Sequence, residues 1–313
     1  MKPLNCNDIR GNWATLLLPI KENDEIDYKG LEADIDYLTS IRLDGIYSNG
    51  TAGEFHSQDD YEYMRINELL SSYCEKRQVP YQIGASQMSP QLSIIRIKWA
   101  VKYHPSAIQV ILGDWFPLQD DEVIDCLKRF AEAADGIGLV LYNPPHAKRK
   151  LSPSMLKRIC DEVPQVVGVK VAGGDEEWYE AMRPLMSRLS IFVPGHLLAT
   201  GVKQGAHGAY SNVACISPLG AQNWTNLMND QLNQALELET RIQAFMKQYI
   251  QPYISEKGYC NAACDKLLAA IGGWGHTTTR LRWPYRSIPS SDVLPLQSIA
   301  QKMIPEMINS STI

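Results

Sequence analysis

One lysine stands near the C-terminal end of an apolar run that has the composition of a buried strand. The run is Val166–Val171, and Lys170 is its one charged residue. If the side chain points inward, desolvation lowers the amine pKa from about 10.4 toward the range of about 7 to 8 that suits a nucleophile. Such an amine could form a Schiff base with a carbonyl substrate. The alternative is a lysine whose stem covers apolar surface while its charge stays in water.

A tyrosine ends a second apolar run, Gly138–Tyr142. Pro144 and Pro145 follow it and restrict the loop, which would hold the phenol of Tyr142 near the end of the strand. A phenol beside a cationic amine or iminium can transfer protons. The alternative, to which we give equal weight, is that Tyr142 is simply an aromatic residue of the core.

A turn of small residues, Ser48–Glu54, contains Gly50, Thr51 and Ala52. Glycine lets the backbone approach a ligand, and the free N–H groups of such a turn can bind a carboxylate. An ordinary strand-to-helix turn is the alternative. Ser57 with Asp60 three residues later resembles a capping box at the start of the next helix.

Two further segments are candidates for the same site. They are Gly195–His196 and Gly208–Ala214, which includes Ser211. His196 could contact a substrate. The six histidines show no His-x-x-x-His pair, so we expect no metal ion.

Eight short β-rich runs alternate with amphipathic stretches up to about residue 215, which favours a TIM barrel over an open doubly wound sheet. The open sheet usually has a glycine-rich turn after its first strand, whereas here that strand ends in Leu18 and Pro19. In a TIM barrel the candidate residues above meet at the C-terminal ends of the strands. The expected strands are Asn12–Leu18, Gly45–Ser48, Tyr81–Gly84, Ala107–Leu112, Gly138–Tyr142, Val166–Val171, Ile191–Val193 and Gly208–Asn212. The expected helices between them include Tyr28–Ile41, Asp59–Lys76, Gln91–Lys102, Asp120–Ala134 and Pro153–Asp161.

Strand patterns stop after Trp224, so we expect a barrel over residues 1–224 and a helical C-terminal domain over 225–313. The periodicity predicts helices at Leu227–Tyr249, Asn261–Ile271 and Val293–Ile308. The segment Gly272–Pro289 is rich in Thr, Arg and Pro, and we expect it to form a connection on the surface.

Composition narrows the class of protein. The 313 residues are 45% hydrophobic and carry a net charge of −5 without a basic stripe, so nucleic acid is not an expected partner. No membrane-length apolar run and no signal-peptide pattern occur, which predicts a cytoplasmic protein with no membrane partner. The seven cysteines form an odd set without C-x-x-C spacing and are expected to be buried thiols.

Taken together, these segments resemble the dihydrodipicolinate synthase and N-acetylneuraminate lyase family of class I aldolases. Gly50-Thr51-Ala52-Gly53-Glu54 looks like the family's G-T-T-G-E loop for the pyruvate carboxylate. Tyr142-Asn143-Pro144-Pro145 looks like its Y-N-x-P motif, and Val167-Gly168-Val169-Lys170 like its Schiff-base strand. Gly208–Ala214 resembles its G-x-x-S-x-x-A/N segment. The family's members are TIM barrels with a helical C-terminal domain.

The resemblance implies a role for each candidate. Lys170 would attack the ketone of pyruvate or another 2-oxo acid, Tyr142 would relay protons, and Thr51 with the backbone of the turn would hold the carboxylate. The substrate-binding set it implies is Gly50, Ala52, His196 and Ser211. It implies no organic cofactor and no metal, and a homo-oligomer, a tetramer or a dimer.

Three departures bear on the substrate. The second threonine of the loop is Ala52, and the arginine that dihydrodipicolinate synthases carry after the Y-N-x-P tyrosine is replaced by Ala147. Their tyrosine pair after the fourth strand is replaced by Leu112-Gly113-Asp114-Trp115-Phe116, so dihydrodipicolinate synthesis is not expected. Glu54-Phe55-His56-Ser57 resembles the G-E-F-x-S run of deoxyglucarate dehydratases, in which case Asp114, His146 and His196 would contact substrate hydroxyls.

The expected function is a Schiff-base lyase that cleaves or forms a C–C bond of a 2-oxo acid. Two alternatives stay open. One is a sugar-acid dehydratase that uses the same lysine, and the other is a non-catalytic 2-oxo acid binder on the same fold.

Overall fold

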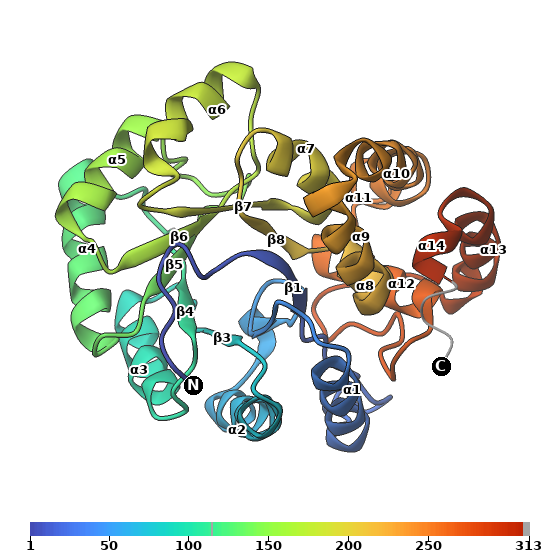
Figure 1. Ribbon diagram of the computed structural model, residues 1–313. Coiled ribbons are helices and arrows are strands. Elements are labelled where there is room, and N and C mark those ends of the chain that lie inside the picture. Colours follow the sequence, from blue (N-terminus) through green and yellow to red (C-terminus); the bar gives the residue numbers. More distant parts are fainter. Residues whose placement is uncertain (114, 309–313) are drawn as a thin grey trace.

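The computed structural model describes residues 1–113 and 115–308, and eight parallel strands form a closed barrel in sequence order (Figure 1). The predicted TIM barrel with a helical C-terminal extension is confirmed. The strand ends differ from the predicted ones by a few residues, as is usual for element boundaries. The strands are β1 (Gly11–Thr15), β2 (Gly45–Ser48), β3 (Tyr81–Gly84), β4 (Ala107–Val110), β5 (Leu139–Tyr142), β6 (Val166–Lys170), β7 (Ser190–Pro194) and β8 (Gly208–Ser211).

Helices surround the barrel on the outside (Figure 1). All five helices predicted between strands are present, and α6 and α7 are additional. They are α1 (Tyr28–Ser40), α2 (Asp60–Arg77), α3 (Pro90–Val101), α4 (Asp120–Ala133), α5 (Pro153–Glu162), α6 (Glu176–Met182) and α7 (Leu198–Lys203).

The capping box predicted from Ser57 and Asp60 is wrong. The N-cap of α2 is Asp59, whose carboxylate accepts from the Glu62 N–H at 2.8 Å while Glu62 accepts from the Asp59 N–H at 3.1 Å. Glu62 is the longer side chain and reaches back across the turn, which an aspartate at 60 does not. Phe55–Ser57 forms a separate 3-10 turn before the helix.

Aromatic side chains fill the interior of the barrel. Trp13 packs edge-on against Phe192 and Tyr210, and Tyr47 packs edge-on against Tyr210. Gly45 leaves the space that the Trp13 indole occupies, because a Cβ there would lie 2.4 Å from the ring. These rings leave the C-terminal end of the barrel as the place for a cavity.

The C-terminal extension packs beside β8 and β1 (Figure 1). Two predicted helices are interrupted. The helix expected over Leu227–Tyr249 breaks at Gln231, whose ψ of 50° is not helical, and the one over Val293–Ile308 breaks at Ile304, before Pro305. The elements are α8 (Val213–Ile216), α9 (Pro218–Asp230), α10 (Leu232–Phe245), the π-helix Met246–Ile250, α11 (Gln251–Ser255), α12 (Asn261–Gly272), α13 (Val293–Met303) and α14 (Pro305–Ile308). Residue 224 lies within α9, and the division of the chain there stays a proposal.

Helix α12 approaches the barrel closely. A Cβ on Gly272 would lie 1.6 Å from the Ile216 carbonyl oxygen, so only glycine fits this contact. The indole N–H of Trp274 donates to the Cys215 carbonyl at 2.8 Å. These contacts fix α12 against the loop that leaves β8.

The cysteines are free thiols, and four of the seven are buried as predicted, namely Cys74, Cys160, Cys215 and Cys264. Cys6, Cys126 and Cys260 are half-buried. Among residues 1–113 and 115–308, no helix has both the length and the apolar character needed to cross a bilayer.

Candidate active site

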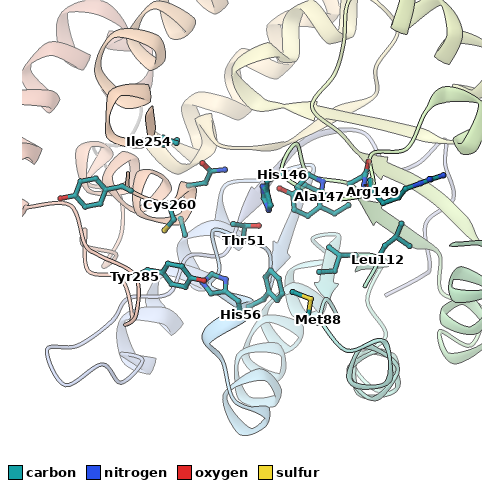
Figure 2. Close-up of a pocket in the computed structure, with 18 residues that line it drawn as sticks. Thr51, His56, Met88, Leu112, His146, Ala147, Arg149, Ile254, Cys260 and Tyr285 are labelled. Atoms are coloured by element: carbon teal, nitrogen blue, oxygen red, sulfur yellow. The ribbon is translucent and has the colours of Figure 1, made fainter. Parts of the chain in front are cut away.

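Two neighbouring chambers, which share part of their walls, open at the C-terminal end of the barrel. The inner chamber, of about 290 Å³, lies between the strand ends and α12 and has Lys170 in its wall. The outer chamber, of about 480 Å³, is shown in Figure 2. Residues of both the barrel and the extension line the two chambers together: Thr51, Tyr142, Ile254 and Asn261.

Lys170 is the last residue of β6 and points into the inner chamber, while Val169 before it packs into the core outside the barrel. Its amine lies 4.2 Å from the ring centre of Tyr142, 5.4 Å from Tyr47 and 5.5 Å from Tyr210. Burial lowers the pKa of Lys170 to about 8, against the opposing charge of Asp265. A substantial fraction of the amine is therefore neutral near physiological pH, as a nucleophile requires.

Tyr142 is the neighbour of Lys170 across the β5–β6 pair. Burial raises the pKa of its phenol, and the Thr51 hydroxyl acts in the opposite direction. Asn143 shapes the loop that follows, since its side chain donates to the Arg149 carbonyl at 2.8 Å and accepts from the Leu151 N–H at 2.9 Å. The phenol is thus held between the lysine and the Thr51 turn.

The turn after β2 presents Thr51 and Ala52 to the inner chamber. Within the described part of the chain, the N–H groups of these two residues have no hydrogen-bond acceptor. Gly50 does not line the chamber, and a Cβ there would lie 2.6 Å from the Tyr47 ring. Two adjacent free N–H groups beside a hydroxyl form a binding place for an anion.

A charge cluster made of the buried Glu54 and Lys266 and the half-buried Arg282 fastens this turn to the extension. Lys266 forms an ion pair with Glu54, and both side chains are at most 1% exposed. The backbone N–H of Arg282 donates to the Glu54 carboxylate at 3.0 Å, and the Arg282 guanidinium donates to both carboxylate oxygens of Glu62 at 2.5 and 2.7 Å. We call these three residues the Glu54 cluster.

His196 follows β7 and lines the inner chamber together with Asn212. The Asn212 amide lies 3.0 Å from His196 Nδ1, and burial lowers the pKa of the imidazole. Ser211 does not line either chamber. Its hydroxyl accepts from the Ala214 N–H at 3.0 Å, because the strand alternation turns Tyr210 inward and Ser211 outward.

Sequence reasoning missed Asp265 and Tyr47, which also line the inner chamber. Asp265 lies on α12, and burial raises its pKa to about 6 while Lys170 acts in the opposite direction. One charged Asp-Lys pair within the apolar run of α12 is a signal that could have pointed to it. The thiol of Cys215 lies in the same chamber, and burial raises its pKa.

The outer chamber contains the position that corresponds to the arginine of dihydrodipicolinate synthases, Ala147, and also His146 (Figure 2). Arg149 lines it too, but its guanidinium is bound to Asp120. On the other side Tyr285 lies against His56, with the rings edge to face at 4.9 Å. Asp114, which we expected to contact a substrate hydroxyl, lies outside the described residues.

Among the described residues, no group of three or more His, Cys, Asp or Glu side chains is placed to hold a metal ion. The inner chamber instead contains the amine of Lys170, the phenol of Tyr142 and the turn that carries Thr51. Lys170, Tyr142, Thr51, Ala52 and His196 are brought together as neighbours of one chamber, whereas Gly50 and Ser211 are not part of its wall.

Comparison with solved structures shows the same fold at low sequence identity. YagE, a prophage protein of the dihydrodipicolinic acid synthase family from E. coli K12, solved in complex with pyruvate, superposes with a TM-score of 0.83 at 18% identity over 94% of this chain and 98% of its own. The N-acetylneuraminate lyase from Fusobacterium nucleatum superposes with a TM-score of 0.80 at 18% identity over 95% and 99%.

Sequence comparison also finds relatives of this chain. A 4-hydroxy-tetrahydrodipicolinate synthase from Thermomicrobium roseum is 27% identical over 67% of this chain and 69% of its own length. An N-acetylneuraminate lyase from Citrobacter koseri is 24% identical over 65% and 68%. The model of the dihydrodipicolinate synthetase family matches residues 8–299. The chain therefore belongs to the dihydrodipicolinate synthetase family.

Proposed function

We propose that this chain is a lyase of the class I aldolase type, which forms an imine between Lys170 and pyruvate or a related 2-oxo acid. The observation that carries the proposal is the juxtaposition in one chamber of a lysine with a lowered pKa and a turn with two free N–H groups. A structural neighbour solved with pyruvate agrees with this substrate class.

The substrate carboxylate binds the N–H groups of Thr51 and Ala52 and the Thr51 hydroxyl. This places the C2 carbonyl toward Lys170. The neutral amine adds to C2, and the resulting carbinolamine loses its oxygen as water, which leaves a protonated imine. Tyr142 exchanges the protons that these steps require. The centre of its ring lies 4.2 Å from the Lys170 amine.

The imine then permits cleavage of the bond between C3 and C4. The electron pair of that bond moves to C3 and on into the iminium nitrogen, which gives an enamine, while the C4 hydroxyl loses its proton and becomes an aldehyde carbonyl. Protonation of C3 and addition of water release pyruvate and the free lysine. The reverse sequence forms the bond.

Dehydration of a sugar acid through the same imine is the alternative reaction. A binder without catalysis is the second alternative, and retained Lys170, Tyr142 and Thr51 argue against it. The homo-oligomer implied by the family resemblance stays a prediction.

Borohydride reduction tests the proposal, because it converts an imine into a stable secondary amine. The protein is incubated with pyruvate and borohydride, its intact mass is measured, and the modified peptide is mapped. We expect one reduced pyruvyl adduct on Lys170 and none in Lys170→Ala. The absence of an adduct with pyruvate and with longer 2-oxo acids would refute the imine mechanism.

A further inference from the structure

The inner chamber contains a carboxylate that the proposed chemistry does not use. Asp265 projects from α12 into the chamber that Lys170 lines. Within the described part of the chain its side chain forms no hydrogen bond and no ion pair, although α12 is otherwise fixed tightly against α8. The fold thus holds an unpartnered negative charge beside the proposed binding place of a 2-oxo acid.

The charge of Asp265 matters more here than at the surface. The titratable groups that interact with its charge are Lys170, Cys215, Cys264, Tyr47 and Tyr142. The pKa of Asp265 is about 6, so the carboxylate is mostly ionised at pH 7.5. In a partly buried chamber an ion is screened less than in bulk water, and a second anion nearby is strongly disfavoured.

Among the described residues that line the two chambers, Lys170 and Arg149 are the lysine and arginine side chains that could face a second anionic group of the substrate. The charge of Lys170 becomes that of the iminium, which stays at C2 of the substrate and away from its distal end. Of the described residues that line the outer chamber, Arg149 is the one lysine or arginine, and it is bound to Asp120. Ala147 brings no charge, and the neighbouring lining includes Phe55, Met88, Ile111 and Leu112.

We propose that Asp265 is a specificity-determining residue that restricts the site to 2-oxo acids with an uncharged distal chain. The substrate carboxylate at the Thr51 turn is then its one anionic group. This inference rests on the proposed function, because it assumes that the 2-oxo acid is bound at Lys170. It predicts that the partner of the C–C bond reaction is a neutral aldehyde rather than an acidic one.

The test uses two 2-oxo acids that borohydride can trap and that have no C4 hydroxyl to permit cleavage. 2-Oxopentanoate and 2-oxoglutarate have the same chain length and differ in a terminal methyl against a terminal carboxylate. We measure the concentration for half-maximal trapping at Lys170 at pH 7.5, with pyruvate as the reference. For the native chain we expect this concentration to be at least tenfold lower for 2-oxopentanoate.

The Asp265→Asn variant keeps the shape of the side chain and removes its charge. We expect the preference to fall to about threefold or less, through better trapping of 2-oxoglutarate relative to pyruvate. Asp230→Asn, an exposed change at the end of α9, is the matched control and should keep the native preference.

Each outcome decides the inference. An unchanged preference in Asp265→Asn, a native chain that accepts 2-oxoglutarate as well as 2-oxopentanoate, or rejection of both acids while pyruvate is trapped would overturn the role of Asp265 and leave the imine mechanism standing. A native chain that traps none of the three acids, neither pyruvate nor 2-oxopentanoate nor 2-oxoglutarate, would instead refute the proposed function itself.

Discussion

Helix α12 supplies one member of each of two lysine–carboxylate pairs, and the pairs differ in whether the charges touch. Lys266 of α12 forms a buried ion pair with Glu54. Asp265, the residue before it, shares a chamber with Lys170 without forming an ion pair in the described part of the chain. Burial lowers the pKa of both lysines. A lysine in direct contact with a carboxylate stabilises the structure, whereas a lysine beside an open space leaves room for a substrate.

The two lysines therefore have different roles: Lys266 stabilises the fold, and Lys170 is available for reaction. The Glu54 cluster satisfies Lys266, which also donates to the Arg280 carbonyl at 2.5 Å, and it fixes the turn that carries Thr51. Lys170 has aromatic ring faces around it, and among the described residues no anion is hydrogen-bonded to it. A chain that placed a carboxylate in contact with Lys170 would hold the amine protonated and would lose its nucleophile.

The largest expected effect is the loss of imine formation in Lys170→Met. We expect trapping of pyruvate to fall at least about a thousandfold, because the nucleophile is removed. The free energy of unfolding at pH 7 should stay equal or rise, since a lysine whose pKa is lowered by folding opposes folding below that pKa. Intact-mass analysis and urea unfolding measure the two quantities. A stability loss similar to that of Lys266→Met would contradict the distinction between the lysines.

The next effect is on stability. Lys266→Met leaves Glu54 buried without its cation, and breaking such a pair costs about 3 to 5 kcal/mol. Urea unfolding with linear extrapolation measures the change. The matched control is Lys302→Met on the exposed side of α13, for which we expect less than about 0.5 kcal/mol. A loss below 1 kcal/mol at Lys266 would show that the pair does not anchor the turn.

Removal of the phenol oxygen should have a smaller effect. Tyr142→Phe keeps the ring beside Lys170 but removes the proton relay, so we expect the initial rate of trapping to fall about a hundredfold. Tyr73→Phe, at an exposed phenol bound to Glu32 on the outside of the barrel, is the control and should behave as the native chain. A native rate in Tyr142→Phe would assign the proton transfers to another group.

The smallest effect is a shift in pH dependence. The initial rate of trapping by cyanoborohydride should rise with pH and reach half of its plateau near pH 8, because the amine must be neutral to attack. The charge of Asp265 favours the ammonium form of Lys170, so Asp265→Asn should move this rise to lower pH. A move to higher pH would show that Asp265 and Lys170 do not interact as the chamber geometry implies.

The barrel and the central part of the site were predictable from sequence because they depend on local patterns. Lys170, Tyr142 and the Thr51 turn each end a strand or follow one, and strand ends meet in a TIM barrel. Asp265 was not identified, since its position depends on the packing of α12 over the strand ends. Ser211 was chosen over its neighbour Tyr210, and a difference of one residue in a strand exchanges the two faces.

The interrupted helices have a related cause. Amphipathic periodicity continues across Gln231 and Ile304, but the chain changes direction at both positions so that α10 and α14 can pack on neighbouring elements. Periodicity reports which face is apolar and does not report where tertiary contacts bend the chain. Asn212, which holds His196, was likewise a partner that only the three-dimensional arrangement could identify.

The position of α12 across the chamber has a consequence for synthesis of the protein. A nascent chain that has emerged through β8 contains Lys170, Tyr142 and every strand of the barrel. It lacks Asp265, and it lacks Lys266 and Arg282, which neutralise and hold Glu54. Lys170 is therefore synthesised about a hundred residues before the segment that completes its surroundings. The site can be assembled only when synthesis of the chain is nearly finished.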